Sequence, residues 1–254
     1  QGMDLEKLKN TAQAMVASGK GILAMDESSP TCQKRFDALG IPSTQEMRRE
    51  YRTMLVTTPG LGQYIGGAIL FDETLRDTTL SGKSFVEVLE DQGVVPGIKV
   101  DTGAKELALR KGEKVTEGLD GLRERLSGYS ALGAQFTKWR AIITIGPGIP
   151  TKYCIDVNAH ALARYAALSQ EAGLVPIVEP EVLMDGDHTI ERCYEVTQTT
   201  LREVFYQLAA QRVDVTGILL KPNMVLSGKS AQNRATPAEV GRYTVDCFNS
   251  VLPP

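Results

Sequence analysis

The sequence is poor in metal-binding side chains. It has only two histidines, and its four cysteines are scattered without a Cys-x-x-Cys pair. Zinc sites need closely spaced Cys and His ligands, so no zinc site is expected. Dispersed thiols in a chain with no secretion signal are typical of the cytoplasm. Because the chain begins at Gln1, a missing transit segment, and with it a plastid location, is an open alternative.

The sequence also lacks a basic tract and an apolar run of membrane length. Its formal net charge is −3, so it has no general attraction to nucleic acid or anionic lipid, and any anion site must be local. We therefore expect neither a nucleic-acid partner nor a membrane partner. With 254 residues, 42% of them hydrophobic, the chain can bury a sizeable core, and we predict a single domain over residues 1–254.

What the sequence has in abundance is an alternation of short apolar runs with helical patterns. This alternation is typical of repeated βα units that form a parallel sheet. Six strands are predicted, over residues 21–26, 67–72, 97–101, 136–145, 174–179 and 217–221. Helices are predicted over residues 4–16, 44–56, 156–172, 189–211 and 237–251. Ser43 predicts a capping box for the second of these, and Thr236, followed by Pro237 and Glu239, predicts the start of the last. Residues 103–133 are predicted to form a polar loop followed by one helix.

The predicted fold class is α/β, a TIM (β/α)8-type barrel with about six of its eight βα units in this chain. An open row of six barrel strands would leave two unpaired edges, which natural proteins normally cover. We therefore expect the domain to be incomplete at its C-terminus.

Charged residues stand at the carboxyl end of every predicted strand, where α/β proteins place their chemistry. Side chains two residues apart on a strand point to the same face. Three strand ends carry such pairs, which we expect to face one pocket: Lys99 with Asp101, Lys138 with Arg140, and Glu179 with Glu181. One charged strand end usually means solvent exposure, but charge at all six favours a mixed-charge site.

Lys221 ends the apolar sixth strand. A desolvated lysine is more easily neutral, and a neutral amine attacks carbonyl carbons, so Lys221 is a candidate for imine formation. Lys138 is expected to help keep it neutral. An imine mechanism also needs a proton carrier and a base, for which Glu179 and Asp26 are candidates whose roles the spacing does not fix. Taken alone, Lys221 also fits a strand-end lysine that reaches solvent.

A second cluster follows the first strand and consists of Ser28, Thr31, Lys34 and Arg35. Hydroxyls and cations at a helix start bind phosphate, because backbone N–H groups and the helix dipole add to the charge. A capped helix with solvated basic residues is the alternative explanation.

Five stretches, taken in this order, resemble class I fructose-1,6-bisphosphate aldolases, the metal-independent Schiff-base family. They are GKGILAMDES at 19–28, GIKVD at 97–101, KWR at 138–140, VEPE at 178–181 and LLKPNMV at 219–225. The resemblance implies an eight-stranded βα barrel, usually a homotetramer. It also implies cleavage of a phosphorylated sugar, fructose 1,6-bisphosphate, to dihydroxyacetone phosphate and glyceraldehyde 3-phosphate, with no metal or other cofactor.

The same resemblance implies a role for each matching residue. Lys221 looks like the imine-forming lysine, Glu179 like the acid/base for dehydration and Asp26 like the residue of carbon–carbon cleavage. Lys138 is similar to the lysine that assists around the carbinolamine. The matching substrate- and phosphate-contacting positions are Lys99 and Arg140, with Ser28, Thr31, Lys34 and Arg35 at the far phosphate, and Glu181 is an additional candidate.

Two departures from the family pattern matter. Thr102 stands where many members have a second lysine, which should alter the local charge without touching the nucleophile. The family also continues into a strand with a Ser-Gly-Gly motif and another with an arginine, which bind the ketone-side phosphate and are absent here. We therefore expect this 254-residue chain by itself to be inactive. A transaldolase-like Schiff-base enzyme and a non-catalytic binding protein on an aldolase fold are the open alternatives.

Overall fold

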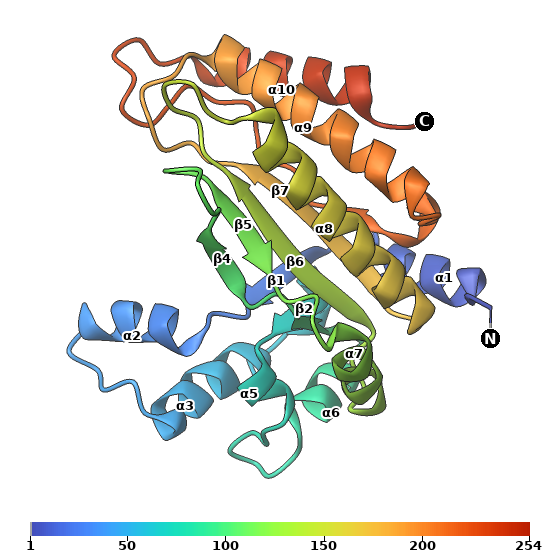
Figure 1. The fold of residues 1–254 in the computed structure, drawn as a ribbon. Helices are drawn as coiled ribbons and strands as arrows, with labels where there is room; N and C mark the ends of the chain where they lie inside the picture. The colour runs from blue at the N-terminus through green and yellow to red at the C-terminus, as the bar shows by residue number, and fades with distance from the viewer. Residues whose placement is uncertain (1) are drawn as a thin grey trace.

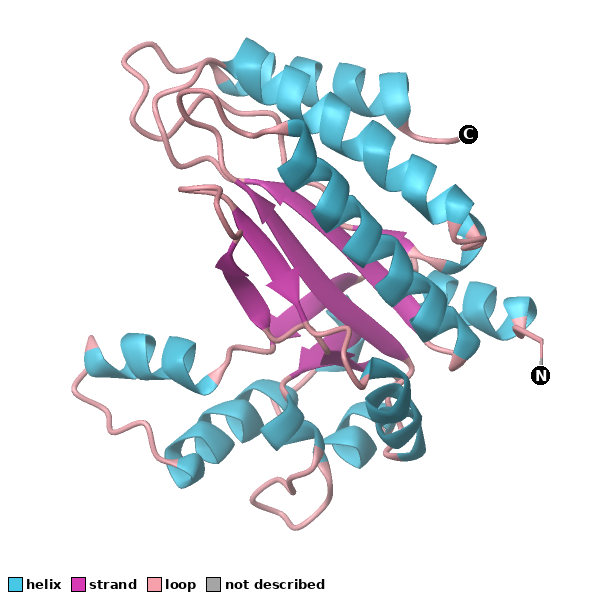
Figure 2. Ribbon diagram, viewed as in Figure 1, coloured by secondary structure: helices cyan, strands magenta, loops and turns pink. Residues whose placement is uncertain are grey.

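The computed structural model describes residues 2–254, and its central feature is a parallel sheet of six strands (Figure 1, Figure 2). The strands lie in the order β1-β2-β3-β6-β7-β8, and each of their pairings is parallel. Their bounds are β1 (Gly21–Met25), β2 (Ile65–Leu70), β3 (Val95–Lys99), β6 (Phe136–Ile143), β7 (Val175–Val182) and β8 (Leu219–Leu220). Because parallel strands are joined by crossovers, all six carboxyl ends gather at one edge of the sheet.

The sheet confirms the predicted α/β class and its TIM-barrel type, since neighbours in the sheet follow chain order as they do in a barrel. The sixth strand is shorter than predicted, because Val215–Gly217 forms a 3-10 turn. The side chain of Gln170 explains the difference: its Nε2 donates to the carbonyl oxygens of Asp214 at 2.8 Å and Gly217 at 3.2 Å. The Gln170 side chain of α8 therefore satisfies these carbonyl oxygens, and the chain joins the sheet only from Leu219.

Helices cover the sheet and connect its strands. Figure 1 shows the three longest, α8, α9 and α10, running side by side next to β6 and β7, while α3 and α6 lie beside the β2–β3 half. Their bounds are α1 (Leu5–Met15), α2 (Ser29–Asp37), α3 (Gln45–Val56), α4 (Leu61–Tyr64), α5 (Asp72–Leu75), α6 (Phe85–Glu90), α7 (Leu122–Ala131), α8 (Lys152–Glu171), α9 (Ile190–Ala210) and α10 (Pro237–Val251). Among residues 2–254, no helix is both long and apolar enough to cross a membrane.

The helix starts differ from prediction in two places. α3 begins after Thr44, whose hydroxyl caps it, and the capping box predicted on Ser43 is wrong. Both the carbonyl and the hydroxyl of Ser43 instead accept hydrogen bonds from Arg48. α8 begins one turn earlier than predicted, because the hydroxyl of Thr151 caps it. The capping box on Thr236 opens α10 as its sequence signal indicates.

A hairpin between β3 and α7 was not predicted. β4 (Gly103–Glu106) and β5 (Lys114–Glu117) pair antiparallel where the sequence suggested a polar loop. Strands of four residues with no apolar alternation carry little local signal. Tertiary contacts hold this hairpin: the Thr116 hydroxyl donates to the Arg140 carbonyl at 2.8 Å, and its N–H donates to Asn158 Oδ1 at 3.2 Å. The hairpin therefore lies beside β6, close to the carboxyl edge of the sheet.

The core packs large side chains against small ones. Trp139 and Tyr165 are fully buried and stack with ring centroids 5.4 Å apart, which joins β6 to α8. On the other face of β6, Phe136 fills the space above Gly97 of β3. A Cβ atom at Gly97 would lie 2.3 Å from the Phe136 ring, so this position requires glycine. Close packing of this kind sets the relative position of β3 and β6.

Candidate active site

A cavity of about 510 Å³ opens at the carboxyl edge of the sheet. All the residues predicted for the site line it except Lys34. The lining residues from that prediction are Asp26, Ser28, Thr31, Arg35, Lys99, Lys138, Arg140, Glu179, Glu181 and Lys221. The three charged pairs expected from strand alternation therefore do face one pocket.

Lys221 follows β8 directly, and its backbone N–H donates to the Val178 carbonyl at 2.9 Å, which holds it on the sheet. Its Nζ donates to Glu179 Oε1 at 2.9 Å. The side chain is 53% exposed. The desolvation expected from the apolar strand is therefore wrong for the end of this side chain, whose environment is a carboxylate and the open cavity.

Glu179 is the central carboxylate of the cavity. Its side chain is only 4% exposed and accepts the hydrogen bond from Lys221 Nζ. Its second oxygen lies 3.8 Å from Lys138 Nζ, and Arg140 Nε lies 3.8 Å from Oε1. Glu179 therefore lies between Lys138 and Lys221, the two lysines that the sequence expected to influence one another. A carboxylate so placed can take a proton from one lysine while the other cation stabilises its charge.

Lys138 and Asp26 form a buried ion pair. Nζ of Lys138 donates to Asp26 Oδ2 at 3.0 Å, and the two side chains are 10% and 9% exposed. The partners are 112 residues apart in the chain and come from β6 and the end of β1. Lys138 is therefore bound on one side by Asp26 and lies near Glu179 on the other.

Arg140 and Lys99 line the outer part of the cavity. Arg140 Nε donates to Glu181 Oε2 at 2.5 Å. Burial alone lowers the pKa of Arg140, but its hydrogen bond to Glu181 and the neighbouring carboxylates outweigh burial and raise the pKa, so the guanidinium stays cationic. Nζ of Lys99 lies 3.7 Å from Asp101 Oδ1. The cavity thus offers two further cations to an anionic ligand.

Asp101, which strand alternation pairs with Lys99, is a further carboxylate of the site. Its Oδ1 accepts from the Gly103 N–H at 3.0 Å, and its Oδ2 accepts from the Arg140 N–H at 3.1 Å. It joins the ends of β3 and β6 and lines the cavity, as do Glu27 and Asn223. Asn223 Oδ1 accepts from the Val182 N–H at 3.0 Å. The sequence signal for Asp101 is its alternation with Lys99. Asn223 lies two residues after Lys221, and no local pattern marks it as part of the site.

The cluster after β1 lies at the start of α2. Ser28 is its N-cap residue, but the Ser28 side chain makes no capping hydrogen bond. Its Oγ instead lies 3.2 Å from Thr31 Oγ1, within hydrogen-bond distance. Arg35 Nη1 donates to Glu27 Oε2 at 2.8 Å. Lys34 is exposed and does not line the cavity. Two hydroxyls, one guanidinium and the helix start therefore lie on one wall.

The prediction of charge at the carboxyl end of every strand is wrong for β6 and β7, because Lys138 and Glu179 lie within these strands, although both line the cavity. At the end of β2 the charges are present but do not reach the cavity. Asp72 accepts a hydrogen bond from the Tyr129 hydroxyl at 2.9 Å, and Glu73 is bound by two arginines of α3. Neither lines the cavity. The two carboxylates after β2 therefore bind side chains of α7 and α3 and help to hold these helices in place.

Within the described part of the chain, no three His, Cys, Asp or Glu side chains are grouped to hold a metal ion. The four cysteines are buried and free. Burial raises the pKa of Cys154 and of Cys247, each to about 11. Their thiols are thus protonated near neutral pH.

The parallel barrel-type sheet and the charged cavity at its carboxyl edge define an α/β-barrel enzyme. The family model for glycolytic class-I fructose-bisphosphate aldolases matches residues 7–254. The chain therefore belongs to the class I fructose-bisphosphate aldolase family.

Named relatives agree with this assignment. The probable fructose-bisphosphate aldolase class 1 of Xanthomonas campestris is 59% identical over 251 residues, covering 99% of this chain and 75% of that protein. The chloroplastic fructose-bisphosphate aldolase 1 of Chlamydomonas reinhardtii is 51% identical, covering 98% of this chain and 66% of that protein. The structure is similar to fructose-bisphosphate aldolase from Plasmodium falciparum, solved with TRAP and a small-molecule inhibitor, at a TM-score of 0.96 and 47% identity, covering 98% of this chain and 72% of that one.

Proposed function

We propose that the protein cleaves fructose 1,6-bisphosphate reversibly to dihydroxyacetone phosphate and glyceraldehyde 3-phosphate through an imine on Lys221. Family membership makes it a fructose-bisphosphate aldolase, a carbon–carbon lyase that uses a Schiff-base lysine and no metal. The observation that supports the residue assignment is the 2.9 Å hydrogen bond between Lys221 Nζ and Glu179 Oε1. It joins a nucleophile to the group that can carry its proton.

In this mechanism Glu179 first takes a proton from the Lys221 ammonium, and the free amine attacks the substrate C2 carbonyl. Glu179 then returns a proton to the carbinolamine hydroxyl, which leaves as water and yields the iminium. Lys138 stabilises the negative charge that passes through Glu179, because its Nζ lies 3.8 Å from Oε2. One carboxylate thus serves attack and dehydration.

Asp26 supplies the base for cleavage. It removes the proton from the C4 hydroxyl, the C3–C4 bond breaks, and its electron pair moves into the iminium to form an enamine. The C4 oxygen leaves as the aldehyde of glyceraldehyde 3-phosphate. The enamine is then protonated and hydrolysed, which releases dihydroxyacetone phosphate and regenerates Lys221. The bond from Lys138 keeps Asp26 turned into the cavity.

The substrate phosphates need cations and donors. In our proposal the wall of Ser28, Thr31 and Arg35 binds the phosphate far from the ketone, with Lys34 contributing from the exposed side of α2. Lys99 and Arg140 contact the sugar and phosphate oxygens of the substrate, and Glu181 orients Arg140 through their 2.5 Å hydrogen bond. Charge-assisted hydrogen bonds of this kind favour phosphate over neutral sugar.

Assembly and location complete the proposal. We propose a homotetramer in the cytoplasm, with a plastid as the alternative because several relatives are named chloroplastic. The four free cysteines fit a reducing compartment. We also propose that residues 1–254 belong to one domain, since a single sheet runs from β1 to β8.

Borohydride trapping tests the proposal. Dihydroxyacetone phosphate and borohydride should label the peptide that carries Lys221 with the mass of the reduced adduct, and fructose 1,6-bisphosphate should compete. Labelling by a transaldolase donor ketone in preference to dihydroxyacetone phosphate would favour the transaldolase-like alternative. Absence of any adduct would favour the non-catalytic one. Cleavage in full-length protein that is lost with a chelator would contradict the metal-free mechanism.

A further inference from the structure

A buried guanidinium lies directly behind the cavity wall. Arg52 of α3 has a side chain only 1% exposed. Its Nη2 donates to the carbonyl oxygen of Glu27 and lies 3.6 Å from Cys32 Sγ on α2, and its Nη1 donates to Glu73 Oε2 at 3.2 Å. One side chain thus connects the end of β1, α2, α3 and the end of β2.

Glu73 is the counter-ion that makes this burial possible. Arg48, one turn earlier on α3, binds it with both ends of its guanidinium, at 2.9 Å from Nε and 2.8 Å from Nη2. The hydrogen bond from Arg48 lowers the pKa of Glu73, so its carboxylate is charged near neutral pH. A buried arginine without such a partner would be strongly destabilising.

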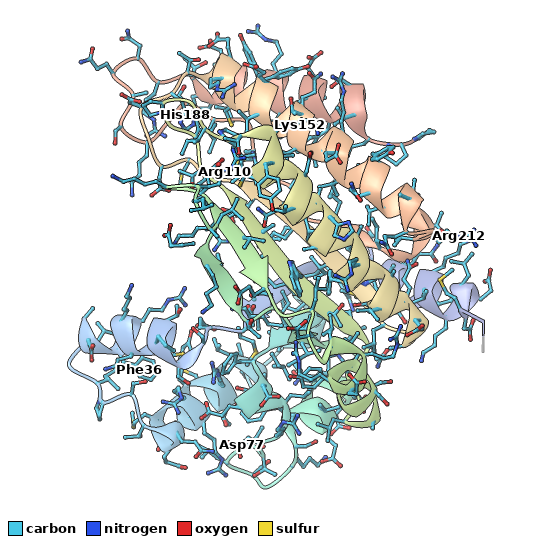
Figure 3. The ribbon with its side chains drawn as sticks, in the orientation of Figure 1. Phe36, Asp77, Arg110, Lys152, His188 and Arg212 are labelled. Carbon is cyan, nitrogen blue, oxygen red and sulfur yellow. The ribbon has the colours of Figure 1, made fainter. Side chains whose placement is uncertain are left out.

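Arg52 binds the carbonyl oxygen of Glu27, the residue that lies between Asp26 and Ser28 in the chain. Asp26 precedes Glu27 and pairs with Lys138 at 3.0 Å, while Ser28 follows it and starts α2 on the cavity wall. The Glu27 side chain is held from the same helix, since its Oε2 accepts from the Tyr51 hydroxyl at 3.1 Å. Phe36 lies on the side of α2 that faces α3 (Figure 3) and meets the Tyr51 ring edge-on, with centroids 5.6 Å apart.

We infer that Arg52 is a positioning residue for carbon–carbon cleavage, which holds Asp26 and Ser28 in place through the Glu27 peptide, with Glu73 as its required counter-ion. The inference rests on the proposed function of Asp26. A planar guanidinium can bind the Glu27 carbonyl and the Glu73 carboxylate at the same time, whereas a lysine at this place is a single point charge. Arg52→Lys should therefore keep the charge but lose the geometry.

Imine formation provides the distinguishing readout. Glu179 lies on β7 and Lys221 directly follows β8, and among the described residues Arg52 makes no hydrogen bond or ion pair with either of them. Loss of Arg52 should leave borohydride trapping of dihydroxyacetone phosphate on Lys221 unchanged while cleavage of fructose 1,6-bisphosphate falls. A general loss of structure would lower both.

The experiment compares Arg52→Lys, Arg52→Met and Glu73→Gln in the full-length protein, with Arg49→Met as the matched control. Arg49 lies on the same helix but donates to the carbonyls of Thr78 and Thr79, away from the cavity. We expect kcat for cleavage to fall about 10- to 100-fold in Arg52→Lys, as misplacement of a catalytic group by about 1 Å does. KM should rise with it, because Ser28 moves as well.

Hydrogen exchange adds a readout that does not depend on activity: amides of residues 26–32 should exchange faster in Arg52→Lys and not in Arg49→Met. Arg52→Met removes the charge and can fail to fold, in which case Arg52→Lys and Glu73→Gln carry the test. The inference is overturned if Arg52→Lys cleaves like Arg49→Met, or if trapping falls in parallel with cleavage. Wild-type protein that does not trap the ketone on Lys221 overturns the proposed function and this inference with it.

Discussion

Lys221 donates a hydrogen bond to Glu179 at 2.9 Å, and the two side chains differ sharply in exposure, at 53% and 4%. The amine end is therefore reachable from the cavity, while its carboxylate partner is shielded from water and fixed by neighbouring cations. A shielded carboxylate with a reachable amine suits transfer of the lysine proton at the moment of attack.

Removing the amine tests this relationship first. Lys221→Met should reduce cleavage by about 10⁴-fold or more, because no other group can form the covalent intermediate. Borohydride should leave no adduct. The control is Lys229→Met, an exposed lysine on the following loop, which should cleave and label like the parent. A labelled Lys221→Met variant would show that a different lysine forms the imine.

The Asp26–Lys138 pair should show strong coupling in stability. Either Asp26→Asn or Lys138→Met leaves a buried charge with a lost partner and should cost about 3–5 kcal/mol in the free energy of unfolding. The double variant should be less destabilised than the sum of the two, while its cleavage activity stays low. Urea unfolding of all four proteins measures the coupling, and strict additivity would contradict the pair's role in folding.

Arg35 and Lys34 should differ in their effect on substrate affinity. Arg35 lines the cavity and Lys34 is exposed outside it. Arg35→Met should raise KM for fructose 1,6-bisphosphate about tenfold, as expected for a lost charge-assisted hydrogen bond, and Lys34→Met should raise it less. Steady-state kinetics with fructose 1-phosphate gives the comparison, because that substrate lacks the far phosphate and should respond to neither change. A larger effect of Lys34→Met would place the phosphate on the exposed side of α2.

Stability should fall in acid in part because of Glu73. Its folded pKa lies below the ordinary value of 4.5, chiefly through the hydrogen bond from Arg48. A carboxyl with a lowered folded pKa contributes stability that is fully present above its unfolded pKa and is lost as pH falls through the folded pKa. Glu73→Gln should therefore be less stable than the parent near neutral pH, and its stability should fall less between about pH 5 and the folded pKa. Urea midpoints across that range check this, with exposed Glu195→Gln as the control; equal slopes in parent and Glu73→Gln would contradict it.

Much of the site was predictable because its residues lie on the strands of a parallel sheet or directly after them. A parallel sheet brings every carboxyl end to one edge, so Asp26 and Lys221, which directly follow β1 and β8, already imply a shared pocket. Lys138 and Glu179 lie within β6 and β7 and line the same cavity. Glu73 shows the limit of this argument. It also ends a strand, yet Arg48 and Arg52 bind it outside the cavity, and neither arginine carries a sequence signal that links it to a residue 21 or more positions away.

The sequence by itself determined the αβ alternation, the six strands, the capping box on Thr236 and the set of charged residues on the strands or directly after them, because these depend on short-range periodicity and side-chain chemistry. Only the tertiary structure decided how those charges are paired. Placing Glu179 against both Lys221 and Lys138, and Arg52 behind Glu27, joins segments that are 42, 41 and 25 residues apart. Pairings of that range depend on strand register and helix packing, which no local pattern encodes.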